Sequence, residues 1–164
     1  MSYAVEDAGE SASRFAALKP ELVIETTRQI TALPIDVLKA EFPADMKFEQ
    51  DEKKLLELCR ELDRASRLPW VLLSAGTNFE TFHKQVEIAC KAGASGFLAG
   101  RALWQEGVRI RSREERFKFF QTTAAPRIQR LKELVKQYGR PWYARLGVEK
   151  GDFGMIAEGW YQNY

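Results

Sequence analysis

The sequence predicts an α/β fold built from parallel βα units. Short apolar segments alternate with amphipathic helical segments along the chain, which is typical of parallel strands buried on both faces. Neither G-x-G-x-x-G nor G-x-x-x-x-G-K-[S/T] is present, which disfavours the nucleotide-binding versions of this architecture. A complete TIM (β/α)8 barrel needs eight strands and about 250 residues, whereas this chain has 164 residues and three strand-like segments. It is therefore either part of a barrel or a small open α/β sheet.

The first strand-like segment lies between two helical ones. A helix is predicted over Pro20–Thr31, because proline suits the first helical position and apolar residues recur among polar ones. The apolar, β-branched run Ile35–Phe42 is bounded by prolines and predicts a strand. An amphipathic helix is predicted over Gln50–Ser66, where leucines recur at three- and four-residue spacing.

A second strand and helix follow. Trp70–Ser74 is an almost wholly apolar strand segment. The next helix is predicted over Asn78–Ala92, with Thr77 or Asn78 as its N-cap and Gly93 as its end.

The third strand is predicted over the small residues of Ser95–Gly100, and Arg101 opens another helix. Ser112–Tyr138 is the longest helical stretch, and we expect Pro126 to kink or divide it. We predict a single domain over residues 1–164, with an N-terminal loop segment (1–19), three βα units (20–111), and C-terminal helices and a tail (112–164).

The composition fits one globular domain and indicates neither nucleic-acid nor membrane binding. Hydrophobic residues make up 45% of the chain, and 25 basic residues balance 23 acidic ones. The N-terminus MSYAVEDAGE has no apolar core of a signal peptide, and no apolar run approaches the roughly 20 residues of a membrane span. We therefore expect a cytoplasmic protein.

The cysteines and the histidine suggest no metal site. Cys59 and Cys90 lie far apart in helical segments, so we expect reduced core thiols. His83 is the single histidine of the chain and cannot build a histidine-based site alone. The aromatic residues are expected to pack rather than to bind sugar: Phe117, Phe119 and Phe120 between helix and sheet, and Trp142, Trp160, Tyr161 and Tyr164 in the tail.

Lys39 lies inside an apolar strand segment, where an ammonium group is unusual. Strand alternation places Lys39 on one face with Val37 and Glu41. Desolvation lowers the pKa of a buried lysine, and the neutral amine forms Schiff bases with carbonyl compounds. Glu41 could shuttle protons in that reaction. The pattern alone favours the alternative, a structural Lys39–Glu41 ion pair or an exposed edge lysine.

Two further candidate sites follow the other strands. Ser74-Ala75-Gly76 joins a strand to a helix, where backbone N–H groups and the Ser74 hydroxyl could bind an anion. Gly100-Arg101 has the same position after the third strand, and the arginine could bind phosphate or sulfonate oxygens. Each alone could be an ordinary turn or a surface arginine. Together they match the phosphate site that barrels often build from their last two βα loops.

Several segments together resemble one enzyme family. PIDVLKAEFP, LPWVLLSAG and AGASGFLAGRALWQEGV resemble segments of the tagatose 1,6-bisphosphate aldolase family, which is similar to the sulfofructose-phosphate aldolases. FAALKPELVIETTRQ and GWYQNY also resemble family segments. The likeness covers nearly the whole chain, and its strand-end motifs occur in order at compatible spacing.

The resemblance implies a (β/α)8 barrel whose sixth strand carries Lys39 as the Schiff-base lysine, with Glu41 beside it. It also implies a substrate phosphate bound by Ser74, Gly76, Gly100 and Arg101. The implied reaction is reversible cleavage of a ketose phosphate, such as tagatose 1,6-bisphosphate, into dihydroxyacetone phosphate and an aldehyde, without a metal or other cofactor.

By the same resemblance the chain begins just beyond the fifth strand. Three strands leave open edges and an uncovered face, so we expect a partial barrel that needs self-association or a complementing N-terminal piece. The alternatives are a sulfofructose-phosphate aldolase with the same lysine chemistry, or a non-catalytic barrel remnant that binds a phosphorylated ligand or a partner chain.

Overall fold

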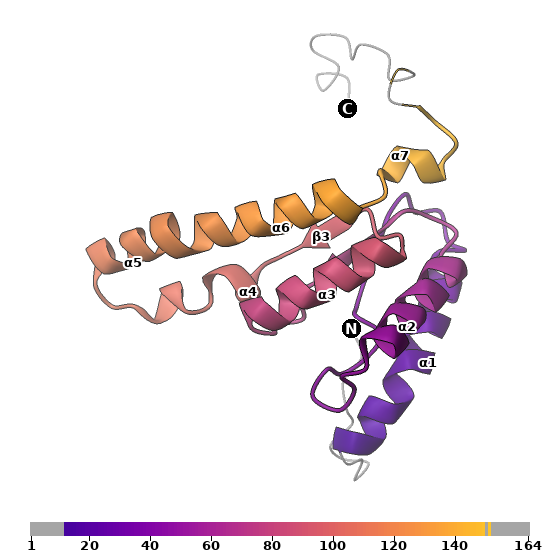
Figure 1. Cartoon of the computed structure of the whole chain (residues 1–164), viewed down its shortest axis with the longest axis horizontal. Coiled ribbons are helices and arrows are strands. Elements are labelled where there is room, and N and C mark those ends of the chain that lie inside the picture. Colours follow the sequence, from indigo (N-terminus) through magenta and orange to yellow (C-terminus); the bar gives the residue numbers. More distant parts are fainter. Residues whose placement is uncertain (1–11, 150, 152–164) are drawn as a thin grey trace.

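Three short parallel strands form one sheet in the order β1–β2–β3. The computed structural model describes residues 12–149 and 151 of the chain (Figure 1). The strands are β1 (Leu38–Ala40), β2 (Trp70–Leu73) and β3 (Gly96–Leu98). They confirm the predicted α/β class and strand order. Each is shorter than its apolar segment, because a ladder forms only where neighbouring strands overlap.

Helices connect the strands and continue beyond them. The helical elements are α1 (Ala12–Ile30), α2 (Glu52–Ala65), α3 (Phe79–Ala92), α4 (Arg101–Trp104), the 3₁₀ turn η2 (Gly107–Arg109), α5 (Arg113–Phe119), the π-helical segment η3 (Phe120–Ala124), α6 (Ala125–Tyr138) and α7 (Trp142–Arg145). None of these described helices is both long enough and apolar enough to cross a membrane.

The strand register divides the sheet into a helix-covered face and an open face. Leu38 pairs with Trp70, and Ala40 pairs with Leu72, which pairs with Phe97. This row packs against the helices in the hydrophobic core, which includes Val23, Leu55, Leu62, Phe82, Val86 and Leu131. The alternate row lies on the opposite face. On the open face Val37 and Leu98 are about half exposed, at 46% and 50%.

The predicted ends of α3 are confirmed. The Asn78 side chain accepts a hydrogen bond from the Thr81 backbone N–H, and Gly93 closes the helix with φ 120°. A β-carbon at Gly93 would lie 2.7 Å from an Asp63 carboxylate oxygen, so only glycine fits. The predicted division of the long C-terminal helix is also confirmed, because η3 separates α5 from α6 directly before Pro126.

The predicted start of the first helix is wrong. Helix α1 begins at Ala12, so Pro20 lies inside it and residues 12–19 are helical rather than a loop. The segment ASRFAALK is rich in alanine, leucine and basic residues, which favour the helix. Proline keeps a helical φ, so its missing N–H removes one hydrogen bond without ending the helix. Residues 1–11 lie outside the described part of the chain.

The predicted packing of three phenylalanines against the sheet is also wrong. Phe117 is 64% exposed and Phe120 is 36% exposed. Helix α5 extends away from the sheet with the start of α6 (Figure 1), so these rings have no strand to cover. Phe119 packs instead against Gly107, where a β-carbon would lie 2.6 Å from the ring. Trp142 is exposed as well, and the other predicted tail aromatics lie outside the described residues.

Both cysteines are buried free thiols, as predicted. Burial raises the pKa of the Cys90 thiol to about 12 and raises that of Cys59 further. Thiolate chemistry at neutral pH is therefore suppressed at both positions.

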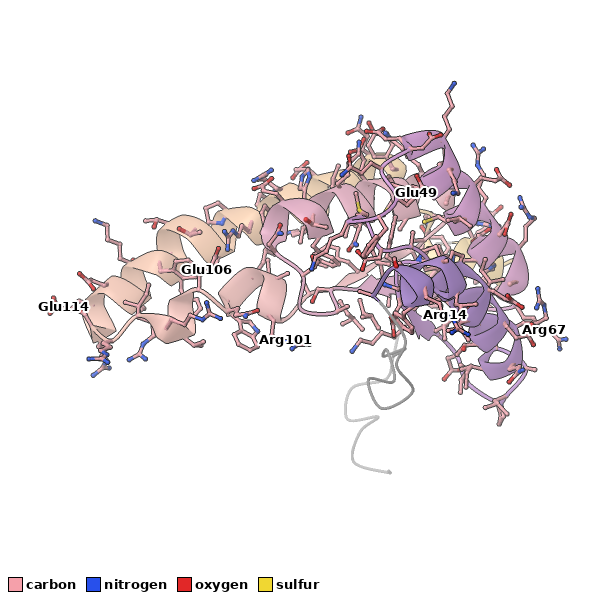
Figure 2. The ribbon with its side chains drawn as sticks, turned by 90° about the horizontal axis from the view of Figure 1, so that it is seen from below. Arg14, Glu49, Arg67, Arg101, Glu106 and Glu114 are labelled. Carbon is pink, nitrogen blue, oxygen red and sulfur yellow. The ribbon has the colours of Figure 1, made fainter. Side chains whose placement is uncertain are left out.

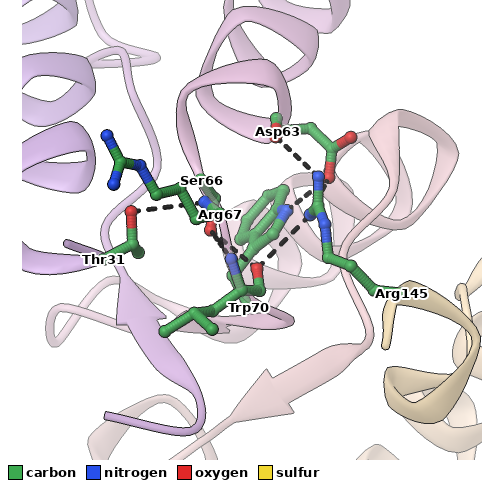
Figure 3. A network of polar contacts seen from close by, with 7 residues as sticks. Thr31, Asp63, Ser66, Arg67, Trp70 and Arg145 are labelled. Carbon is green, nitrogen blue, oxygen red and sulfur yellow. Dashed lines mark hydrogen bonds and ion pairs between the residues drawn. The ribbon is translucent and has the colours of Figure 1, made fainter. Parts of the chain in front are cut away.

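A partly buried carboxylate, that of Asp63, joins α2, β2 and α7 at the end of the sheet opposite the predicted site (Figure 3). One Asp63 oxygen accepts hydrogen bonds from the Trp70 indole N–H at 2.8 Å and from the Arg145 guanidinium at 2.7 Å. Arg145 also donates to the Asp63 backbone carbonyl at 2.8 Å. The two charged side chains are only 17% and 14% exposed, so this pair is shielded from solvent.

Asp63→Ala should lower the free energy of unfolding by about 2–4 kcal/mol, because it leaves the Arg145 charge and the Trp70 N–H without their partner. Urea denaturation measures this loss. Glu80→Ala is the matched control, since the Glu80–Arg130 pair is solvent-exposed and should contribute less than about 1 kcal/mol. Equal losses in the two variants would contradict the structural role of Asp63.

Candidate active site

Five of the six predicted site residues line one cavity at the carboxyl ends of the strands. The cavity has a volume of about 530 Å³ and is lined by Lys39, Leu73, Ser74, Ala75, Gly76, Leu98, Ala99, Gly100, Arg101 and Trp104. The parallel strands bring these residues together, because the segments that follow β2 and β3 meet at the same edge of the sheet. Its walls include exposed side chains, so the cavity is open to solvent.

Lys39 occupies the middle of β1 and points to the open face. Its Cα partner is Val71, which pairs in turn with Gly96. Its side chain is exposed while Leu38 and Ala40 are buried, as in the alternative of an exposed edge lysine that the sequence pattern alone favoured. Glu41 and Leu73 lie on the same face and are only 8% and 9% exposed, so the described residues cover part of this face but leave the Lys39 amine exposed.

Glu41 lies one strand repeat beyond Lys39 but in a different environment. It is only 8% exposed. With Lys39 and Leu73 it lines a smaller cavity of about 70 Å³, which Thr26 and Thr27 of α1 close from the side. Both predicted catalytic residues, Lys39 and Glu41, therefore line the small cavity. Of these two, Lys39 also lines the larger cavity and Glu41 does not.

The segment after β2 is a tight turn with unusual backbone angles. The Thr77 backbone N–H donates to the Ser74 carbonyl at 3.0 Å, and both central residues have positive φ, 48° at Ala75 and 77° at Gly76. This is the pattern of a type I′ turn, in which a non-glycine residue such as Ala75 is strained. The Ser74 side chain is 6% exposed and makes no hydrogen bond to a described residue.

Arg101 lies directly against this turn. A β-carbon at Gly76 would lie 2.8 Å from Arg101 Cζ and 3.0 Å from one terminal nitrogen. Among the described residues Arg101 has no acidic partner within ion-pair distance. In Figure 2, Arg101 lies between the labelled Glu106 and Glu114 on one side and the labelled Arg14 on the other. The guanidinium and the backbone of the Gly76 turn therefore form one cationic corner of the cavity.

Sequence reasoning missed two side chains of this cavity. Leu98 ends β3 on the open face, and Trp104 follows Arg101 by three residues in α4. The three-residue spacing was a usable signal, because side chains at i and i+3 share one face of a helix. Trp104 is 41% exposed, so its indole supplies a flat apolar wall beside the cationic corner.

A protein-family model matches residues 3–106, and its description is DeoC/LacD family aldolase. This range contains all six predicted site residues and the three strands.

Several individual proteins that are similar to this chain are named tagatose 1,6-diphosphate aldolase. The chain is 28% identical over 167 residues to tagatose 1,6-diphosphate aldolase 2 of Enterococcus faecalis, with 92% of this chain and 50% of the relative covered. It is 27% identical to the enzyme of the same name from Streptococcus mutans, with 90% and 50% covered. It is 29% identical to tagatose 1,6-diphosphate aldolase of Staphylococcus aureus, with 80% and 45% covered. The chain thus spans about half the length of the curated relatives it matches.

Gly76→Ala should displace the Arg101 guanidinium, because the new methyl group would occupy its contact position. Gly147→Ala is a matched control, since Gly147 has a similar φ of 70° but no atom within 4 Å of the added carbon. Both variants should lose about 1–2 kcal/mol of stability from the positive φ. Only Gly76→Ala should shift the NMR signal of the Arg101 Nε–H, assigned by its loss in Arg101→Ala. An unshifted signal would contradict the close contact.

Proposed function

The chain belongs to the DeoC/LacD family of aldolases, and from this premise we propose that it contributes a Schiff-base aldolase site in which Lys39 attacks a ketose phosphate. The observation that supports the proposal is the single cavity that Lys39 shares with Arg101 and the Gly76 turn. An amine nucleophile and an anion-binding corner in one cavity suit a substrate that carries both a ketone and a phosphate.

Each step of the proposed reaction assigns a task to these residues. The neutral Lys39 amine adds to the ketone carbon, and loss of water gives a protonated imine. That imine accepts the electron pair of the C3–C4 bond when the C4 hydroxyl loses its proton, which releases the aldehyde and leaves an enamine. Protonation at C3 and hydrolysis then release dihydroxyacetone phosphate and restore the amine.

We assign the proton transfer of carbinolamine formation to Glu41. It shares the small cavity with Lys39 and lies two residues along the same strand face. A buried carboxyl group beside the amine can hold a proton away from bulk water. The proton acceptor for the C4 hydroxyl belongs to parts of the barrel other than these strands.

The substrate phosphate is assigned to Arg101 and the strand-end turns. Arg101 can donate two parallel hydrogen bonds to phosphate oxygens. Ser74 adds a hydroxyl group that has no partner among the described residues, while Gly76 and Gly100 let the backbone approach the anion. The proposed substrate is tagatose 1,6-bisphosphate, following the relatives' names; a sulfofructose phosphate would use the same lysine and phosphate contacts.

The open face of the sheet sets a condition on turnover. Lys39 needs a desolvated surrounding to favour the neutral amine, and the described residues leave it exposed. We propose that further strands of the barrel cover this face, supplied by a complementing piece or a second copy. The chain alone should form the Schiff base but cleave substrate far more slowly than a whole barrel. Turnover by the monomer at the rate of a full barrel would refute this condition.

Borohydride reduction in the presence of dihydroxyacetone phosphate should trap a stable adduct on Lys39, because reduction of the imine makes the bond permanent. Peptide mass spectrometry locates the modified residue. Lys39→Arg should abolish the adduct, whereas Lys53→Arg, a change on an exposed helix lysine, should leave it intact. Folded protein without an adduct on Lys39 would favour a non-catalytic barrel remnant.

Arg101→Ala should weaken binding of dihydroxyacetone phosphate by about 1–3 kcal/mol, roughly 5- to 150-fold, because a charge-assisted hydrogen bond is lost. Isothermal titration calorimetry measures the change. Arg109→Ala is the matched control, since Arg109 is exposed and lies outside the cavity. Equal affinities of Arg101→Ala and the unmodified chain would remove Arg101 from the phosphate site.

A further inference from the structure

A second cavity adjoins the turn that follows β2. It has a volume of about 420 Å³ and is lined by Lys19, Phe42, Ala44, Asp45, Met46, Lys47, Leu73, Ser74, Ala75, Gly76, Thr77, Asn78, Thr81 and Gln85. It shares the turn with the Lys39 cavity but contains neither Lys39 nor Arg101. Its other walls come from α1, the loop after β1 and helix α3. The aldolase chemistry proposed above makes no use of these walls.

Two buried polar side chains face this cavity without a protein partner. Ser74 is 6% exposed and Gln85 is 8% exposed, and neither side chain hydrogen-bonds to any residue of the described part of the chain. No described side-chain nitrogen or oxygen is both fully covered and unpaired. The polar atoms of these two residues therefore keep some solvent-accessible surface. Both residues line this cavity, so a ligand in the cavity could reach these atoms.

Packing does not explain the glutamine. Gln85 lies among buried residues of α3 next to Val86, and Phe82 and Ala89 complete the core-facing stripe. An amide without a protein partner adds no stabilising hydrogen bond at such a position, and an apolar side chain of similar size would serve the core at least as well. A ligand that pairs with the amide would account for a polar group in this place.

The charges of the cavity favour an anion. Two lysines, Lys19 and Lys47, face one acidic residue, Asp45. Lys19 Nζ makes one long hydrogen bond, 3.4 Å to the Ala44 carbonyl, and Lys47 has no ion-pair partner among the described residues. One Asp45 carboxylate oxygen already accepts the Lys47 backbone N–H at 2.9 Å. Both ammonium groups therefore keep donors for a ligand.

We propose that this cavity binds a small hydroxylated oxyanion, a phosphate or carboxylate that also carries hydroxyl groups, at a site separate from the Lys39 cavity. Lys19 and Lys47 bind the anionic group, and the Gln85 amide and the Ser74 hydroxyl bind hydroxyl groups of the ligand. The volume lies within the range of about 300–1,000 Å³ typical of small-molecule sites. Because Ser74 and the Gly76 turn are walls of both cavities, occupancy here is expected to alter the affinity of the Lys39 cavity for its phosphate.

Calorimetry on the Arg101→Ala chain reduces the contribution of the Lys39 cavity, because this variant loses the guanidinium contact to phosphate there, and Lys47→Ala then assigns the remaining binding to the second cavity. The probes are sn-glycerol 3-phosphate, glycerate, inorganic phosphate and glycerol. We expect saturable binding of at least one hydroxylated anion, weaker binding of inorganic phosphate and none of glycerol. The tighter of the two hydroxylated anions identifies the site as selective for phosphate or for carboxylate.

Single-residue variants then show which side chains contact the bound anion. Gln85→Leu and Lys47→Ala should each weaken the bound anion at least tenfold, and Gln85→Leu should not lower the thermal midpoint, because it replaces an unpaired buried amide. Gln137→Leu and Lys53→Ala change exposed residues outside the cavity and should leave affinity unchanged. No binding of any anion, or binding that survives Lys47→Ala, overturns the proposal. Borohydride trapping at Lys39 should be unaffected by Gln85→Leu, so failure of this site leaves the aldolase proposal separately testable.

Discussion

The alternation of side chains along the three paired parallel strands determines on which face of the sheet Lys39 lies. Burial of Leu38, Trp70 and Leu72 under the helices removes apolar surface from water and is the main stabilisation of the sheet. With that row fixed on one face, Lys39 must lie on the other. A shift of register by one residue would bury the lysine under the helices and expose the core. The position of Lys39, the proposed nucleophile, therefore follows from the packing of its neighbours.

The turn of residues 74–77, at the edge of this sheet, forms a wall of two cavities. Ala75 and Gly76 have positive φ, a conformation that costs free energy at the alanine and places the turn backbone between two cavities. On one side it contacts Arg101. On the other side, Ser74 lines the cavity that also contains Lys19 and Lys47. The strained backbone of Ala75 lies between two cavities, and backbone strain at such places is typical of binding sites rather than of positions selected for stability.

Local patterns predicted local features well. The asparagine cap and glycine end of α3 were predictable because both depend on a few adjacent residues, and the five residues of the main cavity were predictable because strand ends converge. The start of α1 was missed because proline was treated as a helix start although strong helix formers precede it. The exposure of Phe117 was missed, and that of Lys39 stayed one of two alternatives, because burial depends on which elements lie opposite and periodicity does not show whether a face is covered. Gln85 gave no signal, since a polar residue in an amphipathic helix is ordinary until its neighbours are seen.

The two parts of the candidate site, the Arg101 corner and Lys39, differ in how far they depend on residues beyond these three strands. The proposed anion-binding corner is formed within the described residues, because Arg101 lies against the Gly76 turn and both line one cavity with Ser74. The proposed nucleophile depends on more, because an amine gains reactivity from the removal of water and the Lys39 side chain is exposed among the described residues. Phosphate binding and Schiff-base chemistry should therefore separate: the first depends on local turn geometry, and the second on whatever packs over Val37 and Leu98. Under the proposed function, an element that covers those half-exposed apolar residues would remove apolar surface from water and desolvate Lys39 in the same step.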